Sequence, residues 1–370
     1  MKVTFKLLWL ILCISNFSCK QEKKSYLSIS ANERTSTIDT TIIAKYKIIN
    51  LNDYSNQISS FDYVTGIDTT IYIFDNIKLE LNLIGINNNS LHKIELNQFK
   101  ELKEFLLGTT SFRVNEEFYF FLNRNEKKLV VTNKYFSIVK IIDLEYYPSS
   151  FEIIKKDIIV HYGNGFERNK SKRVEVFNIG DNYSSKKCCA VEEEKSNYLF
   201  VINSDYFFDK NDTIYFLERY SNFIKELDKD CTNRLKLVLP NGIPDSTFKI
   251  NFYNIKTFAD YVDQNSLEYV SGPAFYNENN LYLYTMQNNS VFLHRLNLKD
   301  KSSKKYDSIR IRNSIWKLER NDFFVGTDAE SNYAIMLQTG ERAINNKLID
   351  INYQKNLNLL SPILILIYFK

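Results

Sequence analysis

Three histidines are the residues of this chain best suited to acid–base or zinc chemistry, because imidazole titrates near neutral pH and binds metals. They lie far apart, and none has a cysteine or a second histidine at the spacing of a zinc site. His92 and His294 occupy the same place in two similar segments, 91–96 and 293–298, which predicts strand positions on a polar sheet face. His161 follows an apolar run, and we expect a structural role for it as well.

Motifs of nucleophilic and phosphate chemistry are absent from the sequence, which has no GxSxG elbow, P-loop, HExxH or GxGxxG. The other reactive side chains are cysteines. Either Cys188 or Cys189 could form a disulfide bond with Cys231 in an oxidising compartment, or these thiols could stay reduced. The sequence leaves both alternatives open.

The N-terminal residues have the layout of an export signal. Lys2 and Lys6 lie before an apolar run from Leu7 to Ile14. A short stretch follows the run up to Ser18. A helix that spans a bilayer needs about 20 apolar residues, so this run is too short to be a membrane span. The layout predicts a signal peptide over residues 1–18.

The pair Ser18 and Cys19 resembles the lipobox of bacterial lipoproteins, in which the thiol is acylated and the chain is cut just before the cysteine. Asn16 departs from that pattern, which prefers leucine there, and the alternative is a secreted protein cut near Ser18. The resemblance implies a lipid anchor at Cys19, a polar tether over residues 19–39 and the outer membrane as a partner. Which side of that membrane is used stays open.

The charge of the chain argues against nucleic acid as a partner. The formal net charge of +4 falls to +2 without residues 1–18, which hold Lys2 and Lys6 and no acidic residue. Lys and Arg are scattered among Asp and Glu, whereas a nucleic-acid binder concentrates its basic residues in one patch.

The composition of the chain also favours β structure. The 25 Tyr and 27 Phe favour strands, and Asn and Asp supply turns.

A polar turn followed by an apolar strand recurs six times. The final residues of these segments lie 47, 40, 56, 67 and 42 residues apart, which suits a repeated four-stranded sheet. Such sheets bury their faces by packing around an axis, which predicts an all-β, six-bladed β-propeller over residues 40–370. The alternatives are a sandwich or two smaller β domains. The six segments are 68–72, 115–119, 155–159, 211–215, 278–282 and 320–324.

Two terminal segments have the pattern of strands that close a ring. We predict that 41–49 and 362–369 share a blade or lie in adjacent blades. Together with Cys19 and the repeats, this pattern resembles the six-bladed β-propeller lipoproteins of Bacteroidota, which are loosely TolB-like. The resemblance covers nearly all of the chain after the signal. It implies the fold and a place in the bacterial cell envelope, and it leaves the activity open.

The longest spacing between repeats contains residues 240–272, in which 258–263 are predicted to form a short helix. Insertions of this kind lie on the faces of a propeller, where ligands bind. The alternative is a lengthened connector that binds nothing. The predicted ligand surface consists of Phe258, Tyr261, Phe275 and Tyr276.

The sequence favours a monomeric binding module for a protein, peptide or glycan, without catalysis or a cofactor. The alternative is a calcium-dependent hydrolase, since six-bladed lactonases and esterases hold calcium at the central channel with carboxylate and amide oxygens. Asp and Asn are common in the predicted turns, but turns favour these residues for backbone reasons as well. The sequence therefore names no calcium ligand and no catalytic residue.

Overall fold

The computed structural model is built mainly from strands, with α2 (Lys100–Leu106) and α3 (Ile255–Gln264) as its described α-helices. No described helix is long and apolar enough to cross a membrane. The predicted signal peptide, Cys19, Cys188, Cys189 and Cys231 lie outside the described residues. The structure describes residues 27–30, 35–38, 43–51, 58, 63–162, 174–186, 205–210, 213–218, 223–227, 234–244, 246–247, 250, 255–277, 279–311, 314–318, 324–328, 333–339, 341 and 362–369.

The described strands form six sheets, which we call blades 1 to 6 in chain order. Blade 1 contains β4 (Tyr63–Ile67), β5 (Thr70–Asp75), β6 (Glu80–Gly85) and β7 (Leu91–Glu95), and blade 2 contains β8 (Thr109–Val114), β9 (Phe118–Asn123), β10 (Lys128–Asn133) and β11 (Ile138–Asp143). Blade 3 contains β12 (Pro148–Ile154), β13 (Asp157–Tyr162), β14 (Val174–Asn178) and β15 (Ser184–Lys186), and blade 4 contains β16 (Asp205–Lys210), β17 (Thr213–Glu218), β18 (Phe223–Glu226), β19 (Arg234–Val238) and β1 (Leu27–Ser30). Blade 5 contains β20 (Tyr269–Asn277), β21 (Asn280–Gln287), β22 (Ser290–Asn297), β23 (Ser303–Ile311), β24 (Ser314–Lys317) and β2 (Thr35–Ile38). Blade 6 contains β25 (Phe324–Asp328), β26 (Tyr333–Thr339), β27 (Pro362–Phe369) and β3 (Ile43–Asn50), and the short helices η2 (Leu96–Gln98) and η3 (Ile179–Asp181) follow β7 and β14.

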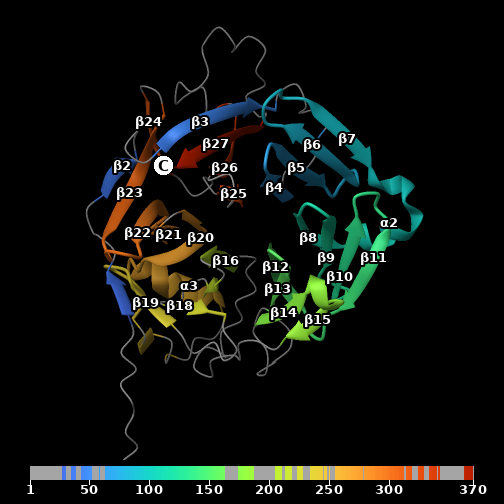
Figure 1. Ribbon diagram of the computed structural model, residues 1–370. Coiled ribbons are helices and arrows are strands. Elements are labelled where there is room, and N and C mark those ends of the chain that lie inside the picture. The colour runs from blue at the N-terminus through green and yellow to red at the C-terminus, as the bar shows by residue number, and fades with distance from the viewer. Residues whose placement is uncertain are drawn as a thin grey trace, which may run out of the picture.

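The six blades surround a central axis (Figure 1). The first strand of each blade is innermost, and consecutive first strands touch: β4 contacts β8, β8 contacts β12, β12 contacts β16, β16 contacts β20, β20 contacts β25, and β25 contacts β4. These contacts close a ring. The prediction of a mainly β architecture built from repeated four-stranded sheets is confirmed.

Apolar side chains on both faces of the middle strands hold neighbouring blades together. Every residue of β13 except Asp157, and every residue of β21 except Gln287, is buried. Because successive side chains of a strand point to opposite faces, both faces of these strands are covered. Each buried Ile or Phe side chain contributes roughly 1.5–3 kcal/mol, so the packing between blades is the main source of stability.

The first described residues run along the outer edges of three successive blades. β1 pairs in parallel with β19 of blade 4, β2 pairs in parallel with β23 of blade 5, and β3 pairs antiparallel with β27 of blade 6. Residues 27–30 and 35–38 therefore belong to the folded domain, and this corrects the tether predicted over 19–39. The physical reason is that an outer strand leaves backbone groups unpaired, and an added strand satisfies them.

The pairing of β3 with β27 joins an N-terminal strand to the last described strand of the chain. Ile49 lies opposite Leu364 in the register, and both side chains are fully buried in the core between blades 6 and 1. The prediction that segments 41–49 and 362–369 share a blade is confirmed.

Candidate functional site

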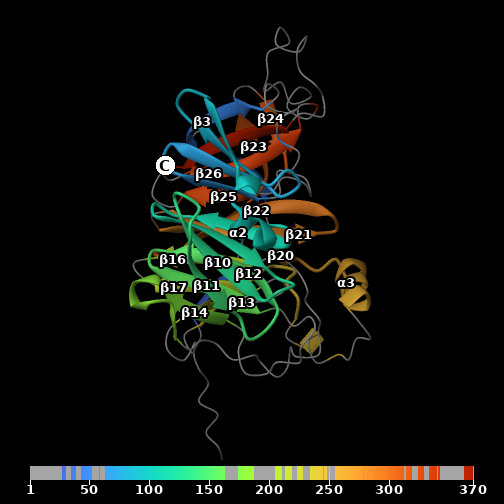
Figure 2. The same ribbon diagram turned by 90° about the vertical axis from the view of Figure 1, so that its right-hand side faces the viewer.

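The connection between β19 and β20 carries α3, which projects from one face of the ring (Figure 2). Phe258 and Val262 lie one turn apart on this helix, and both are buried in the core shared by blades 5 and 6. The helix predicted over 258–263 is confirmed and extends beyond that range. Its opposite side is exposed through Lys256, Thr257, Asp260, Asp263 and Gln264.

Hydrogen bonds fix the end of this connection on blade 5. At the end of β21, Gln287 donates its Nε2 to the carbonyl of Ser266 at 2.9 Å, and Asn288 donates its Nδ2 to the Ser266 hydroxyl at 2.9 Å. The backbone N–H of Glu268 donates to the carbonyl of Asn241 at 2.7 Å. The chain that carries α3 is therefore tied down directly after the helix ends.

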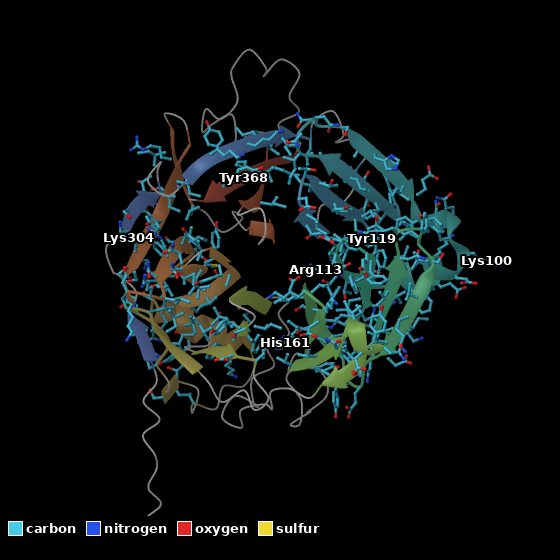
Figure 3. All side chains as sticks on the ribbon, viewed as in Figure 1. Lys100, Arg113, Tyr119, His161, Lys304 and Tyr368 are labelled. Carbon is cyan, nitrogen blue, oxygen red and sulfur yellow. The ribbon has the colours of Figure 1, made fainter. Side chains whose placement is uncertain are left out.

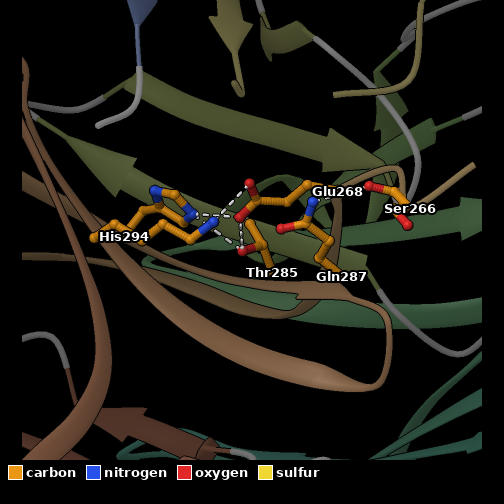
Figure 4. Close-up of polar contacts among 6 residues, drawn as sticks. Ser266, Glu268, Thr285, Gln287 and His294 are labelled. Atoms are coloured by element: carbon orange, nitrogen blue, oxygen red, sulfur yellow. Dashed lines mark hydrogen bonds and ion pairs between the residues drawn. The ribbon is translucent and has the colours of Figure 1, made fainter. Parts of the chain in front are cut away.

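The carboxylate of Glu268 is the centre of a buried polar cluster (Figure 4). Its Oε1 accepts hydrogen bonds from Thr285 Oγ1 at 2.6 Å and from His294 Nε2 at 2.7 Å. Its Oε2 accepts a hydrogen bond from Lys305 Nζ at 2.9 Å. These donors come from β21, β22 and β23, so Glu268 links the start of β20 to the next three strands of blade 5.

The surroundings of this cluster set its charges. Burial would raise the pKa of Glu268, but hydrogen bonds from His294 and Thr285 and the charge of Lys305 lower that pKa to about 2. Burial lowers the pKa of His294 more than its contact with Glu268 raises it. A neutral imidazole that donates from Nε2 keeps Nδ1 as an acceptor, and this Nδ1 is buried without a hydrogen-bond partner among the described residues. Protonation would bury an unpaired N–H there, so the geometry also favours neutral His294.

A carboxylate beside a histidine can orient a general base, but this pair is closed to solvent. Glu268 and His294 are both 0% exposed, and Lys305 is 5% exposed. A substrate does not reach an imidazole with no exposed surface, so the pair acts here by holding the α3 connection on blade 5. His294 lies on a strand, as predicted, but its side chain is fully buried, so the face of β22 that carries it is not a polar face open to solvent.

The other two histidines occupy different environments. His92 is exposed on β7, the outer strand of blade 1. His161 on β13 is buried, its Nδ1 lies 2.7 Å from the hydroxyl of Ser149, and its ring lies 5.1 Å from the ring of Phe216. Ser149 is also buried, so this pair links β12 to β13 inside the blade.

The four predicted ligand residues fall into two separate pairs. Phe258 is fully buried, so its ring is covered by the core, whereas Tyr261 on the same helix is half-buried. Phe275 and Tyr276 lie near the end of β20, and Tyr276 packs against the core between blades 4 and 5. Because α3 precedes the start of β20, the second pair lies roughly 20 Å further along that strand. Phe258 has no exposed surface and therefore does not belong to a ligand surface, which corrects that part of the prediction, whereas a surface formed by Tyr261, Phe275 and Tyr276 stays a prediction.

An ion pair joins the innermost strands of blades 2 and 3. Arg113 on β8 points toward the centre of the ring (Figure 3), and its Nε lies 2.9 Å from each carboxylate oxygen of Glu152 on β12. Both side chains are half-buried. Within the part of the chain that the structure describes, no group of three or more His, Cys, Asp or Glu residues is placed to hold a metal ion.

Comparison with known proteins identifies a fold. No protein-family model and no curated protein matches the sequence. A candidate exported protein of Bacteroides fragilis NCTC 9343 has a similar structure, with a TM-score of 0.59 and 11% sequence identity over 93% of this chain and 99% of the other. A DUF4221 family member from Bacteroides vulgatus gives a TM-score of 0.53 and 10% identity over 89% of this chain and 97% of the other. At these identities the likeness supports the propeller-like fold alone.

Proposed function

We propose that this chain is an exported bacterial lipoprotein, anchored in the outer membrane through an acylated Cys19, whose six-bladed β-propeller is a binding module. Its binding surface is the exposed side of α3, and its ligand is a protein, a peptide or a glycan. The observation that carries this proposal is how α3 is held. Two core side chains and a buried carboxylate cluster fix a helix whose polar side faces solvent.

A fixed helix suits binding because a flexible segment must be ordered on association. That ordering costs roughly 0.5–1.5 kcal/mol for each immobilised side chain. Asp260 and Asp263 are three residues apart and lie on the same side of α3, near Lys256. These side chains offer acceptors and a donor to the amides or hydroxyls of a peptide or a sugar.

Glu268 and His294, the side chains best suited to acid–base chemistry, help to fix α3 from inside blade 5. Glu268 and His294 are closed to solvent and hold the connection that carries α3. Export agrees with the signal layout before Cys19, and the structurally similar Bacteroides fragilis protein is also described as a candidate exported protein. That likeness itself supports only the fold.

Photo-crosslinking in the native envelope tests the α3 surface. A photoreactive amino acid at Asp260 or Gln264 is expected to give a defined adduct with an envelope protein or glycan, because both positions are exposed. The same amino acid at Lys103, exposed on α2, is the matched control and is expected to give no such adduct. Adducts that are equal at all three positions, or absent from α3, would contradict a binding role for this helix.

Fatty-acid labelling tests the anchor. Cells that carry the chain with Cys19→Ser are expected to lose incorporation of labelled palmitate and the fractionation of the protein with membranes, because serine lacks the thiol that is acylated. Cys231→Ser is the control, and its labelling is expected to match that of the unchanged chain. Labelling that survives Cys19→Ser would disprove the proposed anchor.

A further inference from the structure

Exposed cations gather on the outer part of blade 5, which we call the basic rim. They lie on β23, on β24 and in the turn before β23, and one exposed apolar side chain, Ile315, stands beside them with 55% of its surface exposed. Two acidic residues, Asp300 and Asp307, lie among them. The basic residues of the rim are Lys299, Lys301, Lys304, Arg310 and Lys317.

The basic rim differs from the rim on the other side of the ring. Figure 3 places Lys304 and Lys100 at opposite edges of the molecule. Around Lys100, the exposed residues of α2 are balanced in charge, because Lys100 and Lys103 alternate with Glu101 and Glu104. Lys and Arg are scattered along the sequence, but the fold collects an excess of them at one edge.

The N-terminal strands hold this edge close to the proposed anchor. β1 lies on the outer edge of blade 4, and β2 follows on the outer edge of blade 5. Seven residues lie between Cys19 and Leu27, the first residue of β1, and the eight Cα-to-Cα steps from Cys19 to Leu27 span at most about 28 Å when fully extended. An acyl group on Cys19 would therefore keep Leu27, on the outer edge of blade 4, within that distance of the bilayer, and β2 on the neighbouring edge of blade 5 begins five residues after β1 ends.

We infer that the basic rim is a contact surface for anionic lipid headgroups, so that the propeller rests on the membrane by the edge of blade 5. This inference rests on the proposed anchor at Cys19. Electrostatic attraction decays over about 8 Å at physiological ionic strength, so only the edge kept near the bilayer gains from its charge. Each Lys or Arg near an anionic surface raises the binding constant about fivefold. Ile315 gives the same edge an apolar side chain that suits the interfacial region.

Vesicle sedimentation tests the rim without the lipid anchor. The mature chain with Cys19→Ser is mixed with phosphatidylcholine vesicles that contain phosphatidylglycerol, and with pure phosphatidylcholine vesicles. We expect binding to the first kind alone, and we expect added salt to weaken it. The double substitution Lys301→Glu and Lys304→Glu is expected to lower the affinity about tenfold or more. Both side chains are exposed, so thermal unfolding of this variant should match that of the parent chain.

The matched control reverses the same number of charges at the opposite edge. Lys100→Glu with Lys103→Glu is expected to leave vesicle binding unchanged. Equal binding to both kinds of vesicle, or an equal loss in the control, would overturn the inference. Tighter binding to soluble polyglutamate than to the vesicles would also overturn it and would assign the rim to an acidic protein. Because the assay omits the acyl group, its failure leaves the palmitate-labelling result at Cys19 unaffected.

Discussion

At the scale of single residues, the sharpest feature is a histidine whose second nitrogen is buried without a donor. His294 donates from Nε2 to Glu268, and its Nδ1 meets no hydrogen-bond partner among the described residues. The contact between His294 and Glu268 could not be predicted from the sequence, because the two residues lie 26 positions apart and share no local motif. His294 and His92 occupy equivalent places in two similar sequence segments, but His92 lies on an outer strand, whereas His294 lies on an inner strand of its blade.

Acid is expected to destabilise the fold through this residue. Burial lowers the pKa of His294 in the folded state below its ordinary value of 6.5. As the pH falls below 6.5, the unfolded chain takes up a proton that the folded chain resists, so the free energy of unfolding falls by up to about 1.4 kcal/mol per pH unit. His294→Gln keeps a donor for Glu268 and cannot titrate. Denaturant unfolding between pH 7 and pH 5 should therefore show a smaller slope in this variant.

His92→Gln provides the control for this titration, because His92 is exposed. Its stability should follow the same pH dependence as the parent chain. Glu268 adds a second loss of folding stability at lower pH. Its pKa of about 2 lies below the ordinary value of 4.5. The stabilisation from its carboxylate is therefore complete above pH 4.5 and disappears as the pH falls toward 2. An unchanged slope in His294→Gln between pH 7 and pH 5 would contradict the neutral, buried state of this histidine.

At the scale of elements, the sequence predicted individual strands and the helix over 258–263 better than the order of the strands within a blade, and it did not predict α2. Five of the six repeated segments end in second strands of their blades, whereas 320–324 ends in β25, a first strand. Segments 91–96 and 293–298 look alike but form a fourth and a third strand. Alternating apolar residues predict a strand, but they do not specify how many strands flank it, because that depends on distant pairing.

The helix α3 was predictable because its evidence is local. Phe258 and Val262 are four residues apart, which places them on one side of a helix, and both are buried. The edge strands β1 and β2 were not predictable in this way. Each is four residues long and pairs with a strand some 200 or more residues away, as between Leu27 and Leu235. Such pairing leaves no pattern within the segment itself.

At the scale of the whole molecule, the N-terminal strand β3 completes blade 6, whose other strands come from the C-terminal part of the chain. β3 is the outer strand of blade 6, and the core between blades 6 and 1 contains side chains from both ends of the described chain. This arrangement was predicted because both terminal segments have strand patterns that a ring can use. Closure makes the stability of blade 6 depend on residues that are more than 300 positions apart.

A double-mutant cycle on Ile49 and Leu364 measures this closure, because the two residues lie opposite each other and are fully buried. Each change to alanine should lower the free energy of unfolding by about 2–5 kcal/mol through lost burial and a residual cavity. Since the side chains share one core, their effects should depart from additivity by about 0.5 kcal/mol or more in denaturant unfolding. Leu107→Ala, at a residue that is 70% exposed, should cost less than about 0.5 kcal/mol and add independently to Ile49→Ala. Strict additivity of Ile49→Ala and Leu364→Ala would mean that β3 does not close the ring in solution.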